Sequence, residues 1–498
     1  MKARLFLLAL PILAACSTEA ADISVSPAPG ARNVNPDTHI VISFAEAPEL
    51  GTEGVIRVWD AASGELVDSL DLSIPAGLTR SRLYGPECDY IKTPYDYTRE
   101  TVATNRNTVP GTPSCPSAEE TPRDMQLTII GGFSDGFRFY PVILHENTAT
   151  IYLHNNMLEY GHRYKVTIDE SVFGREIKPW KFSTKASGPA DVHNLSVDCN
   201  GGADFNTVQG ALDAIADFDP ELTTISIAAG NYEEIVYARN KTNVRIKGAG
   251  IDEVNVHYAN NEVFNPHPLL LKTNEKKGTF PSRRAAFALD NCSDIVIEDM
   301  SIATDCFGQA EGLLLNGERI AMYRVHITGS GDALQSNGTV YGEDCIIDGD
   351  GDTILGRGAL FLYHTTLRNN GGPFTWCRNF KPSHGDVFVE CSFESKNEMY
   401  PADYGRTGNN HGSVYPDAEL VIINCKTRNF NPAGWSAIGV DTQTMLEFNT
   451  IDLDTAEPAD ISQRHKWSRQ LDAEKDADLI AAYSDPAFVL NGWNPREE

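Results

Sequence analysis

At 498 residues the chain is too long for one ordinary domain, and two or three domains are expected. Its composition, with 41% hydrophobic and 22% charged residues, is that of a globular protein. Its formal net charge of −28 argues against nucleic acid or an anionic membrane surface as a partner.

Residues 1–20 have the features of a targeting signal. Lys2 and Arg4 give it a basic start, and the apolar stretch that follows is too short to span a bilayer. It ends in Leu-Ala-Ala-Cys at Cys16, which resembles the bacterial lipobox, where the cysteine is lipidated and becomes the first mature residue. A plain signal peptide cut after Ala15 or Ala20 is the alternative. We expect export across the inner membrane and a lipid anchor at Cys16, as in outer-membrane lipoproteins that face the periplasm or the cell surface.

Residues 22–187 predict a small β-sandwich. Alternating apolar residues separated by Pro, Asn, Asp and Gly turns occur in "ISVSPAPGARNVNPDTHIVISF", "GVIRVWDAASGELVDSL" and "HRYKVTID". The pattern resembles the immunoglobulin-like modules that precede many bacterial secreted enzymes. Residues 76–130 form a long insertion in this pattern. Because exported proteins can form disulfides, we expect Cys88 and Cys115 to clip this weakly patterned segment.

Residues 191–498 predict a parallel β-helix. After one short amphipathic helix in "DFNTVQGALDAIADF", short β-runs recur, among them "NVRIKG", "MYRVHITG", "FLYHTTLRN" and "VFVECSFES". Equivalent apolar positions at Val325, Cys345 and Thr365 are about 20 residues apart, a period typical of a solenoid built from short strands. The C-terminal "RQLDAEKDADLIAAY" predicts a helix that packs on or caps it. The fold class is therefore all-β.

Three cysteines, Cys345, Cys391 and Cys425, lie inside strand-like runs. A buried free cysteine packs as a small hydrophobic residue. We expect these three to remain reduced inside the solenoid.

An internal repeat supplies the candidate catalytic residues. Residues 327–338 read "ITGSGDALQSNG" and residues 347–358 read "IDGDGDTILGRG". At a shift of 20 the two segments share Ile327/Ile347, Gly329/Gly349, Gly331/Gly351, Asp332/Asp352 and Gly338/Gly358. If the shift between them is one coil, Asp332 and Asp352 occupy the same site on neighbouring coils, roughly 4.8 Å apart. Gln309 lies one coil earlier, after a slightly longer loop.

A lone Asp between glycines is usually a turn-former. Two stacked carboxylates are harder to explain in this way, because their repulsion costs stability. The repulsion also makes one carboxyl group hold its proton more tightly while the other stays ionised. The protonated group can then act as an acid and the ionised one as a nucleophile. We interpret Asp332 and Asp352 as a catalytic pair.

These residues carry a resemblance to the pectin methylesterase family. The segment "CIIDGDGDTILG" resembles its central motif, and "GNYEE", "GQAEGLLLNG", "GSGDALQ", "GRTG", "NPAGW" and "NGWNP" follow the family's order over residues 197–495. The resemblance implies a right-handed parallel β-helix and hydrolysis of methyl esters on galacturonate units of pectin, without a cofactor or a metal. The pattern is that of a divergent bacterial branch.

The resemblance also implies a role for each matching residue. Asp352 matches the nucleophile that attacks the methyl-ester carbonyl, and Asp332 matches the general acid that protonates methanol and then activates water. Gln309 matches a hydrogen-bond donor to the tetrahedral oxyanion. Arg406 matches the arginine that keeps the nucleophile ionised and oriented.

Some positions depart from the family. Gly331 stands where the family has a second oxyanion-binding Gln, so we expect Gln335 or a backbone N–H to substitute. Thr407-Gly408 stands where the family has Pro-Trp, and the lost Trp normally lines the sugar cleft. We predict that Trp376 and Trp435 replace it, although an aromatic residue in a solenoid more often belongs to the core.

Three other functions stay open at this point. Carboxylates about 5 Å apart also suit a retaining glycosidase, and another carbohydrate ester or a thioester is a further substrate class. A carbohydrate-binding surface solenoid is the non-enzymatic alternative. We expect a monomer that acts on methyl-esterified homogalacturonan or its oligomers.

Overall fold

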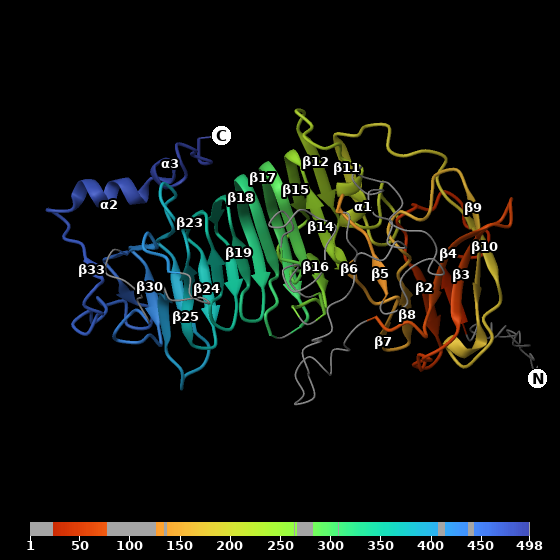
Figure 1. Cartoon of the computed structure of the whole chain (residues 1–498), viewed down its shortest axis with the longest axis horizontal. Coiled ribbons are helices and arrows are strands. Elements are labelled where there is room, and N and C mark those ends of the chain that lie inside the picture. Colours follow the sequence, from red (N-terminus) through yellow and green to blue (C-terminus); the bar gives the residue numbers. More distant parts are fainter. Residues whose placement is uncertain are drawn as a thin grey trace, which may run out of the picture.

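A computed structural model gives the arrangement of the chain (Figure 1). The structure describes residues 23–76, 126–133, 137–262, 264–265, 282–306, 308–406, 414–436 and 443–497. Cys16, Cys88 and Cys115 lie outside these ranges, so the lipid anchor and the disulfide remain predictions.

The N-terminal part forms two four-stranded antiparallel sheets. The first has the order β1 (Ile23–Ser26), β2 (Ile40–Phe44), β8 (Thr148–Ile151), β7 (Val142–His145). The second has the order β10 (Trp180–Ser183), β9 (Arg163–Ile168), β3 (Val55–Asp60), β4 (Leu66–Asp71). Strand β2 alternates buried and half-buried residues, as expected when one face of a sheet covers a core. Residues of both sheets, including Ile42, Val58 and Val166, join one hydrophobic cluster between them.

The second part is a solenoid of parallel strands that forms one continuous 23-stranded ladder. It begins with β11 (Asn194–Val197) and the short helix α1 (Val208–Asp213), whose N-cap Thr207 accepts a hydrogen bond from the backbone N–H of Gly210. The remaining strands are β12 (Thr223–Ile227), β13 (Gly230–Glu233), β14 (Val236–Arg239), β15 (Thr242–Gly248), β16 (Val254–Tyr258), β17 (Phe287–Thr304), β18 (Leu313–Thr328), β19 (Leu334–Ser336), β20 (Thr339–Glu343), β21 (Ile346–Asp348), β22 (Ile354–Gly356), β23 (Ala359–Tyr363), β24 (Thr366–Asn369), β25 (Gly372–Cys377), β26 (Asp386–Val389), β27 (Ser392–Ser395), β28 (Ala402–Arg406), β29 (Glu419–Ile423), β30 (Lys426–Arg428), β31 (Thr444–Phe448), β32 (Ile451–Asp452) and β33 (Arg469–Gln470).

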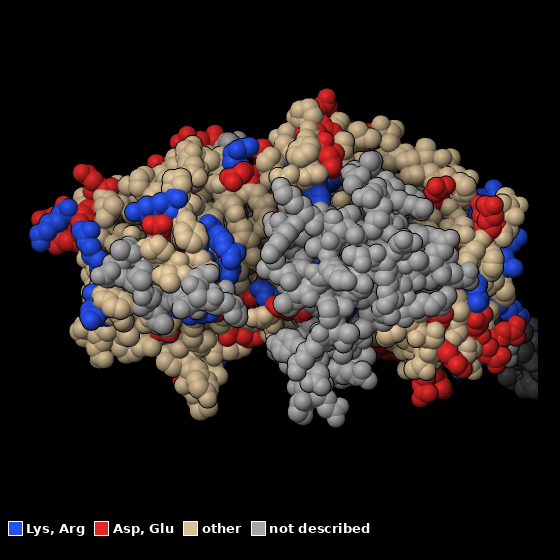
Figure 2. Space-filling model, in the orientation of Figure 1, with Lys and Arg blue, Asp and Glu red and all other residues tan. Residues whose placement is uncertain are grey.

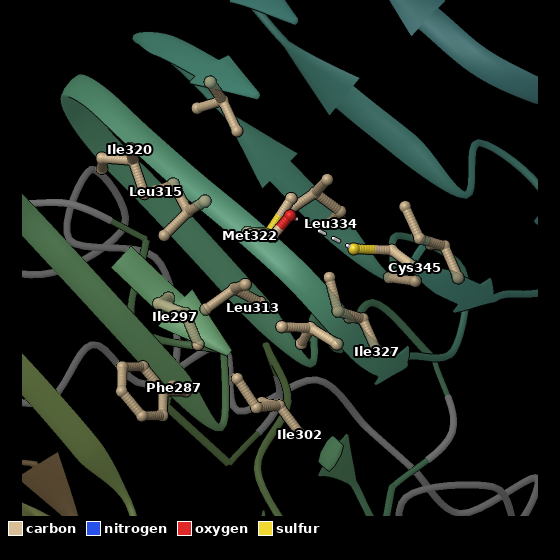
Figure 3. Packing of buried hydrophobic residues seen from close by; sticks show 14 of the residues in the cluster. Phe287, Ile297, Ile302, Leu313, Leu315, Ile320, Met322, Ile327, Leu334 and Cys345 are labelled. Carbon is tan, nitrogen blue, oxygen red and sulfur yellow. Dashed lines mark hydrogen bonds between the residues drawn. The ribbon is translucent and has the colours of Figure 1, made fainter. Parts of the chain in front are cut away.

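The predicted repeat is the coil of this solenoid. His326 of β18 pairs with Ile346 of β21, which pairs with Thr366 of β24, and each step equals the repeat seen in the sequence. Inside the coils, apolar side chains from successive turns stack into one core, which Figure 3 shows around Leu313, Ile327 and Leu334. The prediction of an all-β parallel β-helix is confirmed.

The two parts are joined by buried polar contacts. The Asp37 carboxylate accepts hydrogen bonds from the backbone N–H groups of Asn206 and Thr207 at the start of α1, both at 2.8 Å. Strands β5 (Leu127–Thr128) and β6 (Phe137–Arg138) form a two-stranded sheet, and Phe137 packs on Tyr237 of the solenoid. The end of the predicted insertion and the residues after it therefore lie against the first coils.

The C-terminal helices α2 (Ala477–Ser484) and α3 (Pro486–Val489) lie along the outside of the solenoid, at its C-terminal end (Figure 1). Their apolar residues join a separate cluster with outward-facing side chains of the later strands, such as Phe361 and Val421. The helix predicted for the tail is therefore present, but shorter than its sequence pattern. No helix among the described residues is long and apolar enough to cross a membrane.

The three strand cysteines are buried with free thiols in the structure. Their backbones follow the coil repeat, because the N–H of Thr366 donates to the carbonyl of Cys345 and that of Lys426 donates to the carbonyl of Cys391. The Cys391 thiol lies beside Cys425 on the next coil, and burial raises its pKa well above the usual value. A thiol held protonated in the core reacts slowly with oxidants.

We therefore expect peptide mapping of unreduced protein to find Cys345, Cys391 and Cys425 unpaired, and alkylated only after denaturation. The same map should recover Cys88 and Cys115 as one linked pair. A disulfide that includes any of the three core cysteines would contradict this packing.

Candidate active site

The two candidate catalytic aspartates occupy equivalent positions on successive coils. Leu334 of β19 pairs with Ile354 of β22, and Asp332 and Asp352 each precede their strand by the same short step. The turns also meet, because the backbone N–H of Asp350 contacts the carbonyl of Gly331 at 3.5 Å. One coil of the solenoid therefore places the two aspartates at equivalent positions of adjacent turns, as the sequence repeat predicts.

A polar ladder beside these turns fixes them to one another. Asp350 accepts a hydrogen bond from the Ser330 hydroxyl on the preceding coil at 2.8 Å, and another from the Asn370 amide on the following coil. The backbone N–H of Asp352 donates to the carbonyl of Pro373 at 2.7 Å. Asp352 itself has a φ of +44°, a conformation that Asp tolerates better than most residues. These contacts hold both aspartate turns at a defined spacing.

Arg406 at the end of β28 pairs with Asp352 through both of its oxygens. Its Nε donates to Oδ1 at 2.7 Å and its Nη2 donates to Oδ2. A two-pronged guanidinium contact of this kind favours the ionised carboxylate and fixes its orientation. The predicted partnership of Arg406 and Asp352 is present in the structure.

A second arginine, Arg284, is the centre of a carboxylate cluster around Asp332. Its Nη2 donates to Oδ2 of Asp332 at 2.6 Å, its Nε donates to Glu311 at 2.7 Å, and its Nη1 donates to Glu262 at 2.6 Å. One cation therefore faces three carboxyl groups. They cannot all be ionised without a large repulsion, so this part of the site retains a proton.

Asp332 is the carboxyl group best placed to carry that proton at neutral pH. Its residue is only 7% exposed. Burial, opposed by Arg284 and reinforced by the negative charges of Glu311 and Asp352, raises the pKa of Asp332 to about 7. Glu311 is fully buried and its pKa is also raised by burial, but Arg284 covers both of its oxygens. The site thus pairs a carboxyl group whose pKa is raised with a neighbouring carboxylate that Arg406 holds by both oxygens.

Gln309 lies at the edge of this cluster with its amide nitrogen available. Its Oε1 accepts a hydrogen bond from Nη1 of Arg284 at 3.2 Å, so its other end is a donor. The backbone of its coil is held beside Asp332, because Ala310 and Ser330 exchange two backbone hydrogen bonds. Gln309 therefore lies beside the Arg284–Asp332 pair, and its role as a donor to a substrate oxygen stays a prediction.

The structure explains the glycine that departs from the family pattern. Gly331 has a φ of +74°, where a side chain is strained. Space is not the obstacle, because the nearest atom to a Cβ added there would be the carbonyl oxygen of Gly308 at 3.5 Å, an ordinary contact. The backbone conformation of the turn therefore favours glycine and disfavours a second Gln at this position.

One row of side chains crosses the strands next to the aspartates. Gln335, Leu355, Trp376 and Arg406 are register partners on four successive coils. The guanidinium of Arg406 lies 4.0 Å from the centre of the Trp376 ring, and Oε1 of Gln335 and Nε1 of Trp376 are buried without a hydrogen-bond partner. Gln335 and Trp376 thus lie in the row that ends at Arg406, and substrate binding by either residue stays a prediction.

The prediction for Trp435 is wrong. The residue is 2% exposed, belongs to the solenoid core and packs on the Tyr404 ring at 5.2 Å. A side chain inside the coil cannot face a substrate, so Trp435 has the structural role that is commoner for aromatic residues in solenoids.

Sequence reasoning missed the carboxylate cluster. Glu311 follows Gln309 closely in "GQAEGLLLNG", and an acidic residue that opens an apolar run was the available signal. Arg284 lies in "SRRAAF" and precedes Asp332 by 48 residues, with no motif around it to mark it.

A separate group of potential metal ligands lies near the N-terminal sheets. Ligand atoms of Glu233, His257 and Asp305 are within 4.8 Å of one another. They already interact among themselves and with a neighbour, because His257 Nδ1 is 2.6 Å from Asp305 and His145 is 2.7 Å from Glu233. The group has no contact with the catalytic carboxylates among the described residues.

Comparison with known proteins supports one family for the solenoid. The pectinesterase family profile matches residues 194–375, which include Gln309, Asp332 and Asp352. This part of the chain is similar to the pectinesterase family. It is 28% identical to pectinesterase QRT1 of Arabidopsis thaliana over 291 residues, 54% of this chain and 72% of the relative. It is 24% identical to pectinesterase 31 of the same plant over 307 residues, 60% of this chain and 94% of the relative.

Solved structures of pectinesterases share a moderate likeness with this chain. Pectin methylesterase from carrot covers 61% of this chain and 95% of its own, with 21% sequence identity and a TM-score of 0.48. The sheets of residues 23–183 precede the segment that the family profile matches.

Proposed function

We propose that the protein hydrolyses the methyl esters of galacturonate units in pectin, with Asp352 as nucleophile and Asp332 as general acid and base. In the first step an oxygen of the Asp352 carboxylate attacks the ester carbonyl carbon. The bond from that carbon to the methoxy oxygen breaks, and Asp332 gives its proton to the departing oxygen, so that methanol leaves. The acyl group stays on Asp352 as an anhydride.

In the second step Asp332, now ionised, takes a proton from water. The resulting hydroxide attacks the carbonyl carbon of the galacturonyl group, and the bond to Asp352 breaks. The products are a free galacturonate carboxyl group and the original enzyme, with Asp332 protonated again. Gln309 donates to the carbonyl oxygen, which carries negative charge in both tetrahedral intermediates.

The observation that carries this proposal is that the carboxyl groups on two adjacent turns differ in their burial and in their hydrogen-bond partners. Arg406 binds both oxygens of Asp352, whereas Asp332 is buried and shares its arginine with two other acids. A pair of this kind separates nucleophile from acid, which ester hydrolysis through an acyl-enzyme requires. Trp376 and Gln335 would line the sugar-binding surface beside the pair.

Surface charge supports an acidic polysaccharide as the substrate. In Figure 2, Lys and Arg atoms gather over the middle and later coils of the solenoid, while carboxylates are dense over the N-terminal sheets. The chain as a whole has 69 acidic and 41 basic residues, so its composition alone does not account for a basic surface on the solenoid. A basic surface on the solenoid would attract galacturonate polymers.

One assay tests the reaction against its closest alternatives. Highly methylated pectin is incubated with the full chain, and methanol, reducing ends and unsaturated ends are measured together. Methanol without new ends is expected. New reducing ends would indicate a glycosidase, unsaturated ends would indicate a lyase, and no product at all would favour a carbohydrate-binding solenoid or a different ester.

We also propose that the protein is a monomer held in a bacterial outer membrane by a lipid on Cys16. The predicted tether of residues 17–25 can extend no further than residue 22, because β1 begins at Ile23. A Cys16→Ser variant should leave the membrane fraction and appear in the soluble fraction, because serine lacks the sulfur that carries the lipid. Fractionation with mass spectrometry of the mature N-terminus measures this. A variant that stays with the membrane, or a mature N-terminus beyond residue 16, would contradict the anchor.

A further inference from the structure

Two histidines and two carboxylates meet where the N-terminal sheets contact the first coils of the solenoid. Glu233, the last residue of β13, and His257 of β16 are register partners on successive coils. Asp305 follows the end of β17 on the next coil, and its backbone N–H donates to the carbonyl of Tyr258. His145, the last residue of β7, comes from the N-terminal part, and its Nε2 lies 2.7 Å from Oε2 of Glu233. The strand register therefore stacks three of these side chains, and the other part of the chain supplies the fourth.

The stacked side chains are close enough to share one cation. One ligand atom from each of Glu233, His257 and Asp305 lies within 4.8 Å of the other two. Among the residues that the structure describes, no other group of three such side chains is placed to hold a metal ion. The four ligand atoms around a tetrahedral zinc ion are about 3.4 Å apart, given bonds of about 2.0–2.1 Å. Small side-chain movements therefore separate this arrangement from a coordination shell.

Ordinary hydrogen bonds do not account for the whole group. Elsewhere in the solenoid His326 contacts Asp348 at 2.7 Å, and two cationic side chains also face that carboxylate. Glu233 and Asp305 have no such compensation, because in the described part of the chain no Lys or Arg forms an ion pair with either. Two carboxylates this close repel each other. A divalent cation between them would remove the repulsion and leave the group without net charge, since the two imidazoles bind a metal in their neutral form.

The donor set selects the kind of cation. Imidazole nitrogens and carboxylate oxygens are common zinc ligands, and four of them complete a tetrahedral site. Calcium and magnesium prefer oxygen ligands, in larger numbers. The side chains of Glu233 and His257 are only 13% and 10% exposed, whereas that of His145 is 61% exposed. Zinc would therefore enter past His145 and be shielded from water by the residues of the solenoid.

We propose that His145, Glu233, His257 and Asp305 bind one zinc ion that fastens the N-terminal sheets to the first coils of the solenoid. The hydrogen bonds that join each imidazole to a carboxylate would give way to bonds to the ion. Because the folded chain alone brings these ligands together, zinc should stabilise the docked arrangement of the two parts. The ion takes no part in the proposed reaction, and the proposal does not depend on that reaction.

The test measures zinc binding and stability in the untagged protein after dialysis against EDTA. Isothermal titration calorimetry is expected to show one zinc ion per chain with a Kd below about 10 μM. Zinc at about 100 times its Kd should raise the melting temperature by a few degrees, because it binds the folded chain alone. Calcium at the same concentration should leave the melting temperature unchanged.

Two variants locate the ion. His145→Gln alters a mostly exposed side chain, so the fold should be kept. Zinc should bind this variant at least about tenfold more weakly, because even the loss of an outer partner of a metal ligand costs about 10–100-fold. His257→Gln should abolish binding, and circular dichroism checks its fold. His326→Gln is the matched control, because His326 pairs with a carboxylate outside this group, and it should bind zinc as the parent does.

A parent Kd above the expected limit would overturn the proposal. Zinc binding that a folded His257→Gln retains would place the ion elsewhere and would overturn it as well. Parent affinity in His145→Gln would confine the ion to the solenoid, and the bridge between the two parts would be rejected. A higher affinity for calcium than for zinc would reject the assignment of the ion.

Discussion

Asp352→Asn is expected to abolish methanol release from pectin. The amide has no anionic oxygen to attack the ester carbonyl, so the acyl-enzyme cannot form. Activity should fall by at least about 10³-fold, because no neighbouring group can take over a covalent step. Methanol release from highly methylated pectin, measured at saturating substrate, gives the comparison with the parent.

The variant should keep its fold, because the side chain is half-buried and its amide still fits between the coils. Circular dichroism and the melting temperature check this. The matched control is Asp344→Asn, which alters an exposed acid of the same coil outside the polar ladder of the aspartate turns and should cost far less activity. Methanol release by Asp352→Asn within tenfold of the parent would reject Asp352 as the nucleophile.

Asp332→Asn is expected to slow the reaction severely, but to a degree that depends on the leaving group. Methoxide is a poor leaving group and needs a proton as it departs, a contribution of roughly 10²–10⁴-fold. The phenoxide of an activated aryl ester departs without this proton, so the variant should lose much less activity on an aryl ester. Steady-state rates on pectin and on an aryl ester measure the difference. Equal losses on both esters would remove Asp332 as the acid.

The pH dependence of the parent follows from the same group. Because the folded-state pKa of Asp332 is raised to about 7, the group is protonated below this pH and loses its proton above it. The acid form is needed to release methanol, so kcat/KM should fall by about tenfold per pH unit above 7. Asp332→Asn cannot titrate, and its residual rate should lack this fall. A parent profile that rises between pH 7 and 9 would contradict the assignment.

The sequence was sufficient to predict the solenoid and the aspartate pair. Both depend on one short repeat, and in a parallel β-helix the repeat along the chain becomes a translation between coils. Arg406 was found through a motif, although more than one repeat length of chain separates it from its register partner Trp376. These features are local in sequence or marked by a short pattern.

The rest depended on contacts that no local pattern encodes. Arg284 reaches Asp332 from two coils earlier, and its importance follows from three carboxylates that meet only in the folded chain. Whether a tryptophan faces the core or the substrate depends on a single step of register, which is why Trp376 and Trp435 could not be distinguished.

The row of register partners that ends at Arg406 also shows how such a protein can diverge in evolution. The steps from Gln335 to Leu355 and from Leu355 to Trp376 are nearly equal in length, but the step from Trp376 to Arg406 is clearly longer. The extra residues leave the strand stack as loops, so the insertion does not move the catalytic arginine. Corner loops of the later coils can therefore gain or lose length during evolution while the reactive groups keep their spacing. The same corners are the places where foreign recognition loops could be grafted without disturbing the chemistry.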